Sequence, residues 1–516
     1  MALGVLPVVT LRAQSEAETT RNQRWAARET PAALAAFATD FTAKLNMGDD
    51  FIHTGLRGRA PLRPIAESIK AGRHEEAMKA FAGYYYAKLM DPTGYGFDAA
   101  DVSPYTEGVA GYGRWPSVVW DPSASREAVV KQADALLSGK IEVRGKPFSV
   151  VPGKVNWNHP LPYGASVDPA NPKEVPDPAI ASGAILNPLA QAYAMTGDVR
   201  YHKAWVDLID DWSLNAFPLQ AQHPLFIAAT SQNTLAGTGV RLVKTLAELR
   251  RIMPSDRTPL PPRVLAQALS RAFGDFPLST VVYLRSNTHN WTPGTALMLT
   301  SLMGDEFRTS PFYFRENKRR NVEDNAVTQN LRDGTENQQC PWYNHNYANT
   351  IQAIRLMEAR SRQDSWREVQ WVRDAWRDGY WMDEIREHLR AHATYLIHLR
   401  TPQGEWPIPY RGGSKRLGDR SSRFVSPEAY ADPVNLAVLG AVDGDSSVKP
   451  PYHSEWFPYA GYSVMRDGWG PLDGYAAMFA SPRPGAYGGY RSRSNNNVFS
   501  LAAAGQDLLV DDTTGF

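Results

Sequence analysis

Apolar residues recur every three or four positions over most of the chain, from about Pro31 to Leu399. This spacing is typical of amphipathic α-helices that bury one face. The clearest stretches are separated by short segments rich in Gly, Pro, Asn and Asp, and they are Glu67–Leu89, Ser125–Leu137, Ile185–Met195, Tyr201–Leu214, Thr234–Ile252, Val264–Phe273, Pro293–Leu302, Thr350–Arg360 and Trp381–Leu399. Paired helices without a constant sequence repeat indicate an α/α barrel or toroid rather than a regular solenoid.

The residues between two of the predicted helices indicate where one helix ends and the next begins. Gly197 is suited to the left-handed position that ends a helix, and Asp198 can cap the start of the next one. The segment Asp91–Gly183 is different, because it is rich in Pro, Gly, Tyr and Trp. Long irregular segments inside compact domains are often functional, and we expect this one to form a groove or lid.

Short alternating runs replace the helical pattern after about Thr401. They predict strands at Tyr462–Arg466, Tyr475–Phe479, Val498–Leu501 and Leu508–Val510. The sequence therefore predicts an α+β multidomain protein, with an incomplete α/α toroid followed by an antiparallel β-sandwich domain that is truncated. The expected divisions are a catalytic toroid over residues 15–400, a linker over 401–450 and the start of the sandwich over 451–516.

Composition and charge exclude several classes of protein. The net charge is +1, so no global field favours nucleic acid or an anionic membrane. No apolar run is long enough for a membrane span. A single cysteine, Cys340, excludes a disulfide framework and a CxxC metal site. Residues 1–14 resemble a secretory signal without its charged start, which favours a secreted or periplasmic bacterial protein; an ordinary N-terminus is the alternative.

Two polar clusters in the helical part are candidates for chemistry. The first contains Arg285, Asn287, His289, Asn290 and Trp291, just before the predicted helix that starts near Pro293. Amides and a His at a helix start suit a carboxylate ligand, although such groups also serve as ordinary caps.

The second cluster contains Trp342, Tyr343, His345 and Tyr347. Tyr343 and Tyr347 are four residues apart and would share a helix face. His and Tyr can both transfer protons when their surroundings shift their pKa, but a Tyr pair is also common in a core.

Aromatic residues mark two further segments. Asn156 and Trp157 lie in the irregular segment, and a late loop carries Tyr487, Tyr490, Arg491, Arg493 and Asn495. The chain has 15 Trp, 23 Tyr and 18 Phe, and flat rings beside polar groups suit sugars. A hairpin loop with solvated arginines is the alternative for the late segment.

In order along the chain, several motifs resemble the heparinase II/III-like polysaccharide lyases, closest to the heparinase III type and related to toroid alginate lyases. The resemblance covers about residues 150–516 and depends on the following motifs: Asn156-Trp157, Leu186-Asn187-Pro188, Thr196-Gly197-Asp198, Asp211-Trp212, Asp333-Gly334 with Pro341-Trp342-Tyr343, Gly461-Tyr462 with Met465-Arg466, and Gly505 to Asp511. Each piece is short, and their order makes the match specific.

The resemblance implies a catalytic His289 and Tyr343, separated by 54 residues, with Asn287 or Asn290 neutralising a uronate carboxylate and Tyr490 as a second phenol. It implies substrate contacts from a larger set: Asn156, Trp157, Arg285, Trp291, Trp342, His345, Tyr347, Tyr487, Arg491, Arg493 and Asn495. No cofactor or metal is needed. The family's His-rich stretch is absent near Tyr490, and Glu336 stands where alginate lyases have an Arg, so substrate recognition should differ.

The expected function is β-elimination on an anionic, uronic-acid-containing polysaccharide. Two alternatives stay open. One is an α/α-barrel glycoside hydrolase acting on uronate oligosaccharides, which would need paired carboxylates; Asp207, Asp210 and Asp211 are candidates, and we interpret them as a solvated helix face. The other is a non-catalytic polysaccharide-binding relative.

Overall fold

The structure is a computed structural model. It describes residues 20–45, 62–90, 124–143, 146–157, 160–162, 174–176, 178–216, 238–275, 304, 306–310, 333–334, 387, 391, 394–395, 398–399, 401–402, 454–459, 461–479 and 498–510. The chain divides into two compact units: unit 1 is Met1–Leu284, Ala296–Glu316 and Glu358–Arg373, and unit 2 is Arg285–Thr295, Asn317–Met357 and Asp374–Phe516. The domain boundaries expected from the sequence stay predictions.

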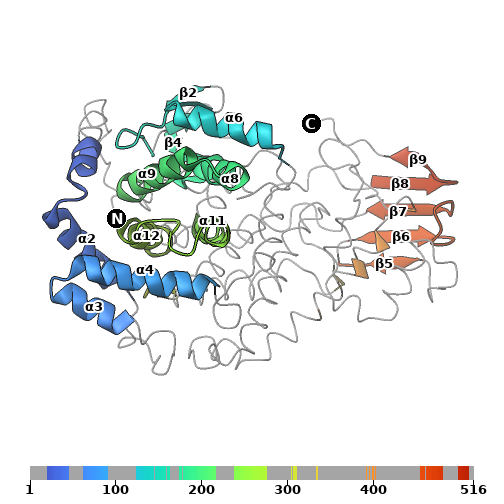
Figure 1. The fold of residues 1–516 in the computed structure, drawn as a ribbon. Coiled ribbons are helices and arrows are strands. Elements are labelled where there is room, and N and C mark those ends of the chain that lie inside the picture. Colours follow the sequence, from blue (N-terminus) through green and yellow to red (C-terminus); the bar gives the residue numbers. More distant parts are fainter. Residues whose placement is uncertain are drawn as a thin grey trace, which may run out of the picture. The chain divides into compact units, whose positions relative to one another are not determined.

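The described helices of unit 1 pack against each other in layers (Figure 1). From one side to the other, the order is α6 (Arg126–Leu137), α8 (Asn187–Thr196), α9 (Val199–Asn215), α12 (Pro262–Leu269), α4 (His74–Met90) and α3 (Leu62–Lys70). Two further helices flank them: α11 (Thr238–Ile252) contacts α8, and α2 (Pro31–Lys44) contacts α3 and α4. The helical character of this part is confirmed, and closure into a toroid stays a prediction.

Shorter elements connect these helices. Two antiparallel hairpins are formed by β1 (Lys140–Val143) with β2 (Lys146–Ser149) and by β3 (Pro160–Pro162) with β4 (Glu174–Pro176). The other short elements are α7 (Pro178–Ala181), the 3₁₀ turn η1 (Ala184–Leu186) and the π-helical η2 (Ser270–Asp275). Among the described residues, no helix is both long enough and apolar enough to cross a membrane.

Helix ends follow the local chemistry of their capping residues. The Asp198 side chain accepts a hydrogen bond from the Arg200 N–H at 2.9 Å, and Gly197 has φ +73°, as predicted for this stop. The single helix expected over Glu67–Leu89 is wrong, because α3 ends at Lys70 and α4 begins at His74. Gly72 lies between them with φ +79°, a conformation that ends the first helix.

The largest fully buried side chains of unit 1 are aromatic. Phe41, Tyr85, Trp157, Trp205 and Trp212 are all less than 2% exposed. Trp205 and Trp212, the two tryptophans of α9, therefore pack inside unit 1. Closely packed large rings tolerate little change in side-chain volume, so this core constrains the positions of the helices that it contacts.

A buried ion pair ties α4 to the segment at residues 306–310. Lys88 Nζ lies 2.5 Å from Glu306 Oε1, and the two side chains are 4% and 1% exposed. The Tyr84 hydroxyl donates a second hydrogen bond of 3.1 Å to the same oxygen. Because both side chains are buried, their mutual attraction offsets part of the cost of removing two charges from water.

The described strands of unit 2 form one antiparallel sheet in sequential order (Figure 1). The strands are β5 (Glu455–Phe457), β6 (Tyr462–Arg466), β7 (Tyr475–Phe479), β8 (Val498–Ala503) and β9 (Gln506–Val510). The predicted strands at Tyr462–Arg466, Tyr475–Phe479, Val498–Leu501 and Leu508–Val510 are confirmed as parts of β6 to β9, whereas β5 was not predicted. The sheet agrees with one layer of the expected sandwich, and a second layer stays a prediction.

One face of this sheet is buried under residues from the 394–399 region. Tyr395 and Leu399 belong to the same apolar cluster as Phe457, Tyr462 and Tyr475. Arg466 lies between the Trp469 and Tyr475 rings, 4.3 and 4.5 Å from their centroids, and donates a hydrogen bond of 2.8 Å to the His398 carbonyl. Burial lowers the pKa of Arg466 to about 10.

Replacing Glu306 with Gln should destabilise unit 1, because the buried Lys88 ammonium loses its counter-charge. We expect the free energy of unfolding to fall by about 3–5 kcal/mol, measured by urea denaturation. The control is Asp207→Asn, which breaks the exposed pair with Lys203 on α9 and should cost less than about 1 kcal/mol. Equal losses in the two variants would contradict the role given to the buried pair.

Candidate functional site

Most of the predicted site residues lie outside the described residues. This holds for the predicted catalytic residues His289, Tyr343, Asn287, Asn290 and Tyr490. It also holds for most predicted substrate contacts, which are Arg285, Trp291, Trp342, His345, Tyr347, Tyr487, Arg491, Arg493 and Asn495. Their roles stay predictions.

Asn156 and Trp157 are described, and their surroundings differ. Asn156 is half-buried, whereas Trp157 has an exposed fraction of 0%. The Trp157 indole therefore packs inside unit 1 and presents no open face. A substrate-binding role for either residue stays a prediction, while the position of Trp157 gives it a structural role beside Asp211.

Asp211 on α9 lies beneath the loop that follows β2. Its Oδ1 accepts a hydrogen bond of 2.6 Å from Asn215 Nδ2, one turn along the helix. The indole N–H of Trp157 and the backbone N–H groups of Gly153 and Val155 also face the carboxylate. None of them makes a well-aligned hydrogen bond to Oδ2, so they stabilise the anion only weakly.

Burial dominates the acidity of Asp211. It raises the pKa of this carboxyl to about 6, against the opposing effect of Asn215 and the facing N–H groups. The backbone of the loop approaches the Trp25 ring closely at Gly153. Glycine suits this position, because it has φ +81° and an added Cβ would lie 2.5 Å from the ring. The residues around Asp211 thus join α9, the loop 150–157 and the N-terminal segment.

Asp210 is held differently from its neighbour. Arg263 on α12 contacts its Oδ2 at 2.5 Å, and Arg28 approaches the same oxygen at 3.3 Å. Asp210 and Asp211 are 4% and 0% exposed. The interpretation of these aspartates as a solvated helix face is therefore wrong for both. It holds only for Asp207, whose side chain is 37% exposed and pairs with Lys203.

A separate contact in unit 2 anchors the start of the segment that carries Tyr343. Asp333 Oδ2 accepts a hydrogen bond of 2.8 Å from the Tyr459 N–H, in the turn after β5. Gly334 follows with φ +83°, a left-handed conformation that favours glycine. The Asp-Gly pair seen in the sequence is thus anchored to the turn that follows β5.

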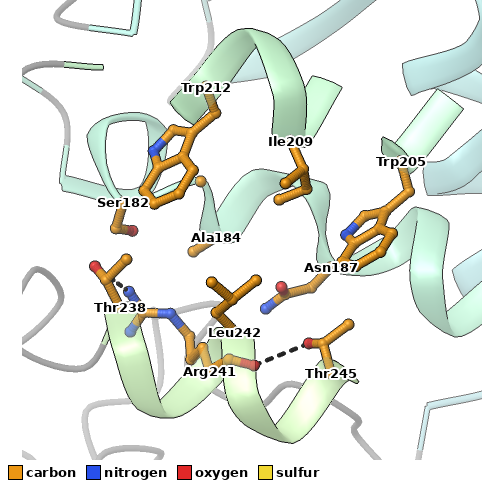
Figure 2. Close-up of a pocket in the computed structure, with 11 residues that line it drawn as sticks. Ser182, Ala184, Asn187, Trp205, Ile209, Trp212, Thr238, Arg241, Leu242 and Thr245 are labelled. Atoms are coloured by element: carbon orange, nitrogen blue, oxygen red, sulfur yellow. Dashed lines mark hydrogen bonds between the residues drawn. The ribbon is translucent and has the colours of Figure 1, made fainter. Parts of the chain in front are cut away.

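A small cavity lies between α8, α9 and the first turns of α11 (Figure 2). Its volume is about 20 Å³. The described residues that line it are Ser182, Gly183, Ala184, Asn187, Trp205, Ile209, Trp212, Thr238, Arg241, Leu242 and Thr245. Neither Arg241 nor Thr238 stands out in the sequence, because nothing local distinguishes them from other residues of an amphipathic helix.

No described residues gather as a metal site. Within the part of the chain that the structure describes, no three His, Cys, Asp or Glu side chains lie close enough to hold an ion. The described geometry therefore consists of buried carboxylates and a small cavity in unit 1, and an anchored Asp-Gly turn in unit 2.

Comparisons with known proteins give a result at the level of the fold. No family model matches the sequence, and no curated protein matches it. Solved structures do match. A mutant of the heparan sulfate lyase HepC from Pedobacter heparinus is 17% identical with a TM-score of 0.60, over 91% of this chain and 64% of that one. A heparinase III structure is 18% identical with a TM-score of 0.58, over 90% of this chain and 66% of that one.

The chain has the heparinase III fold. The resemblance inferred from the order of the motifs is thereby confirmed for the architecture, a helical part followed by a part with a sheet. The chain spans about two thirds of the length of these lyases.

Asp211 should make stability fall as the pH rises. In the unfolded chain its carboxyl ionises near 3.8, whereas the folded protein keeps the proton until about pH 6. Between these values the unfolded state binds fewer protons, so the free energy of unfolding decreases, by about 3 kcal/mol in total.

We expect Asp211→Asn to remove this slope. The difference in unfolding free energy between wild type and variant, measured by urea denaturation from pH 4 to pH 7, should change by most of that amount, because pH 4 lies just above the pKa of the unfolded state. Asp207→Asn controls for loss of a negative charge from α9. A pH-independent difference for Asp211→Asn would refute the assignment.

Proposed function

We propose that the chain is a polysaccharide lyase that cleaves a uronic-acid-containing polymer by β-elimination. The observation that carries the proposal is the match to heparan sulfate lyase structures over about 90% of this chain. The ordered sequence motifs also support the proposal, because they are properties of the amino-acid sequence alone.

The proposed chemistry needs a base, an acid and a carboxylate binder. The base removes the proton on carbon five of the uronate, the electrons form the C4–C5 double bond, and the C4–O bond breaks. Asn287 or Asn290 would face the carboxylate and stabilise the developing enolate, as donors do in an oxyanion hole. Either His289 or Tyr343 would take the proton, and Tyr343 would protonate the leaving oxygen. Tyr490 is a candidate second phenol.

The proposed substrate is an anionic polysaccharide held by aromatic and basic residues. Trp291, Trp342 and Tyr487 would offer ring faces to sugars, while Arg285 and Arg493 would pair with acid groups. Such polymers occur outside the cytoplasm, so we also propose a secreted or periplasmic protein. A panel of uronate polymers will identify the polymer that is cleaved.

The hydrolase alternative loses its best carboxylate candidates. Asp210 and Asp211 are 4% and 0% exposed, and Asp210 is neutralised by Arg28 and Arg263. A glycosidase needs two carboxyl groups that flank the scissile bond in an accessible groove. These two aspartates instead hold helices together.

Tyr343→Phe should reduce formation of unsaturated product at least about 100-fold while the protein stays folded, since it removes the proton donor. The assay follows the ultraviolet absorbance of the 4,5-unsaturated uronate on a panel of uronate polymers. Tyr459→Phe is the matched control, because Tyr459 is 54% exposed and contacts Asp333 through its backbone.

The same panel tests the alternatives. Chain cleavage without new absorbance would favour a hydrolase. Binding to a polymer without any cleavage would favour a non-catalytic relative. Wild-type turnover by Tyr343→Phe would remove this residue from the mechanism.

A further inference from the structure

The loop 150–157 contains a tight turn that fixes its path. Val151 and Lys154 close this turn, because the Val151 carbonyl accepts a hydrogen bond of 2.9 Å from the Lys154 N–H. Pro152 and Gly153 occupy the central positions, and Gly153 has φ +81°. Proline followed by a glycine with positive φ is typical of a type II turn. The path of the chain into Lys154 is therefore set by local chemistry.

Buried and outward-facing residues alternate after the turn. Val155 and Trp157 each have an exposed fraction of 0%, whereas Lys154 is exposed and Asn156 is half-buried. An extended segment shows this alternation when one of its sides packs against a core. Val155 and Trp157 therefore point into unit 1. Lys154 and Asn156 share the other side, where successive side chains are about 7 Å apart.

The inner side of this segment is held by a buried carboxylate and by a packed ring. The Val155 N–H and the Trp157 indole N–H both face the Asp211 carboxylate. At the turn, the backbone lies so close to Trp25 that an added Cβ at Gly153 would be 2.5 Å from the ring. Close packing on this side leaves the segment little freedom to rotate. Its outer side therefore stays turned toward solvent.

The outer side carries a cation and an amide that are both accessible to a ligand. Among the described residues, no hydrogen bond or ion pair engages the Lys154 ammonium or the Asn156 amide. Lysine supplies three N–H donors with a full charge, and asparagine supplies two N–H donors and one acceptor. The charged donor suits a carboxylate or a sulfate, and the amide suits a neighbouring sugar hydroxyl.

We propose that Lys154 and Asn156 form a binding subsite for an anionic polysaccharide, in which Lys154 pairs with an acid group and Asn156 binds a sugar hydroxyl beside it. The class of ligand rests on the proposed lyase function. The subsite adds Lys154, which no sequence motif marks. Because the turn and the contacts with Asp211 already fix the loop, binding costs little backbone ordering. The charge of Lys154 favours acidic chains over neutral ones.

The test is isothermal titration calorimetry with tetrasaccharides from heparan sulfate, alginate and glucuronan. The parent protein is the full chain carrying Tyr343→Phe, which limits cleavage of the ligand. We expect Lys154→Gln to weaken binding of the preferred tetrasaccharide about fivefold, as expected for the loss of one exposed charge pair. Lys131→Gln is the matched control and should leave the affinity unchanged, because Lys131 is also exposed in unit 1 but lies on α6.

Two further measurements test the chemistry of the subsite. Asn156→Ala should also weaken binding, and the double variant with Lys154→Gln should lose less than the product of the two single effects, because both side chains contact one ligand. A tetrasaccharide whose carboxyl groups are reduced to alcohols should bind the parent and Lys154→Gln more nearly alike. Parent-like affinity of Lys154→Gln, an equal loss in Lys131→Gln, or no binding of any tetrasaccharide by the parent would overturn the proposal. Thermal unfolding confirms that each variant is folded.

Binding and cleavage test separate claims. If the chain with Tyr343 intact forms unsaturated product although binding is independent of Lys154, the lyase function stands and the subsite fails. If binding depends on Lys154 while no polymer is cleaved, the subsite stands and the chain is a polysaccharide-binding protein rather than a lyase.

Discussion

The packing of the described part of unit 1 depends on two carboxylates that α9 buries. Two carboxylates next to each other, Asp210 and Asp211, lie out of solvent on this helix, and burying them is costly unless they are neutralised. The charge of Asp210 is neutralised at its Oδ2 by Arg28 and Arg263, which belong to the N-terminal segment and to α12. The need to compensate this charge therefore joins three parts of the chain that are distant in sequence.

Asp211 meets the same constraint in another way. No cation contacts it among the described interactions, and its pKa rises to about 6. The protein instead closes the loop 150–157 over it, with Gly153 allowing Trp25 to pack close by. Asn156 and Trp157, which the sequence marked as substrate contacts, lie on this loop. Their surroundings show how a motif recognised for function can also be fixed by packing.

Much of the fold could be predicted because the relevant signals are local. The strands Tyr462–Arg466 and Tyr475–Phe479 have the predicted limits, since alternation over five residues is enough to define a half-buried strand. The stop at Gly197 and Asp198 was also correct, because capping involves neighbouring residues. The break at Gly72 was missed, because apolar residues continue at helical spacing on both sides of it.

The sequence by itself determined the helical and strand segments, their order, and the motifs that resemble heparinase-type lyases. Periodicity, caps and motif spacing are properties of neighbouring residues, so they can be read without a structure. Only the tertiary structure decided that Asp210 and Asp211 are buried and that Asn187 and Arg241 line one cavity. These facts depend on contacts between residues tens to nearly two hundred positions apart, which set burial and electrostatic surroundings that no local pattern records.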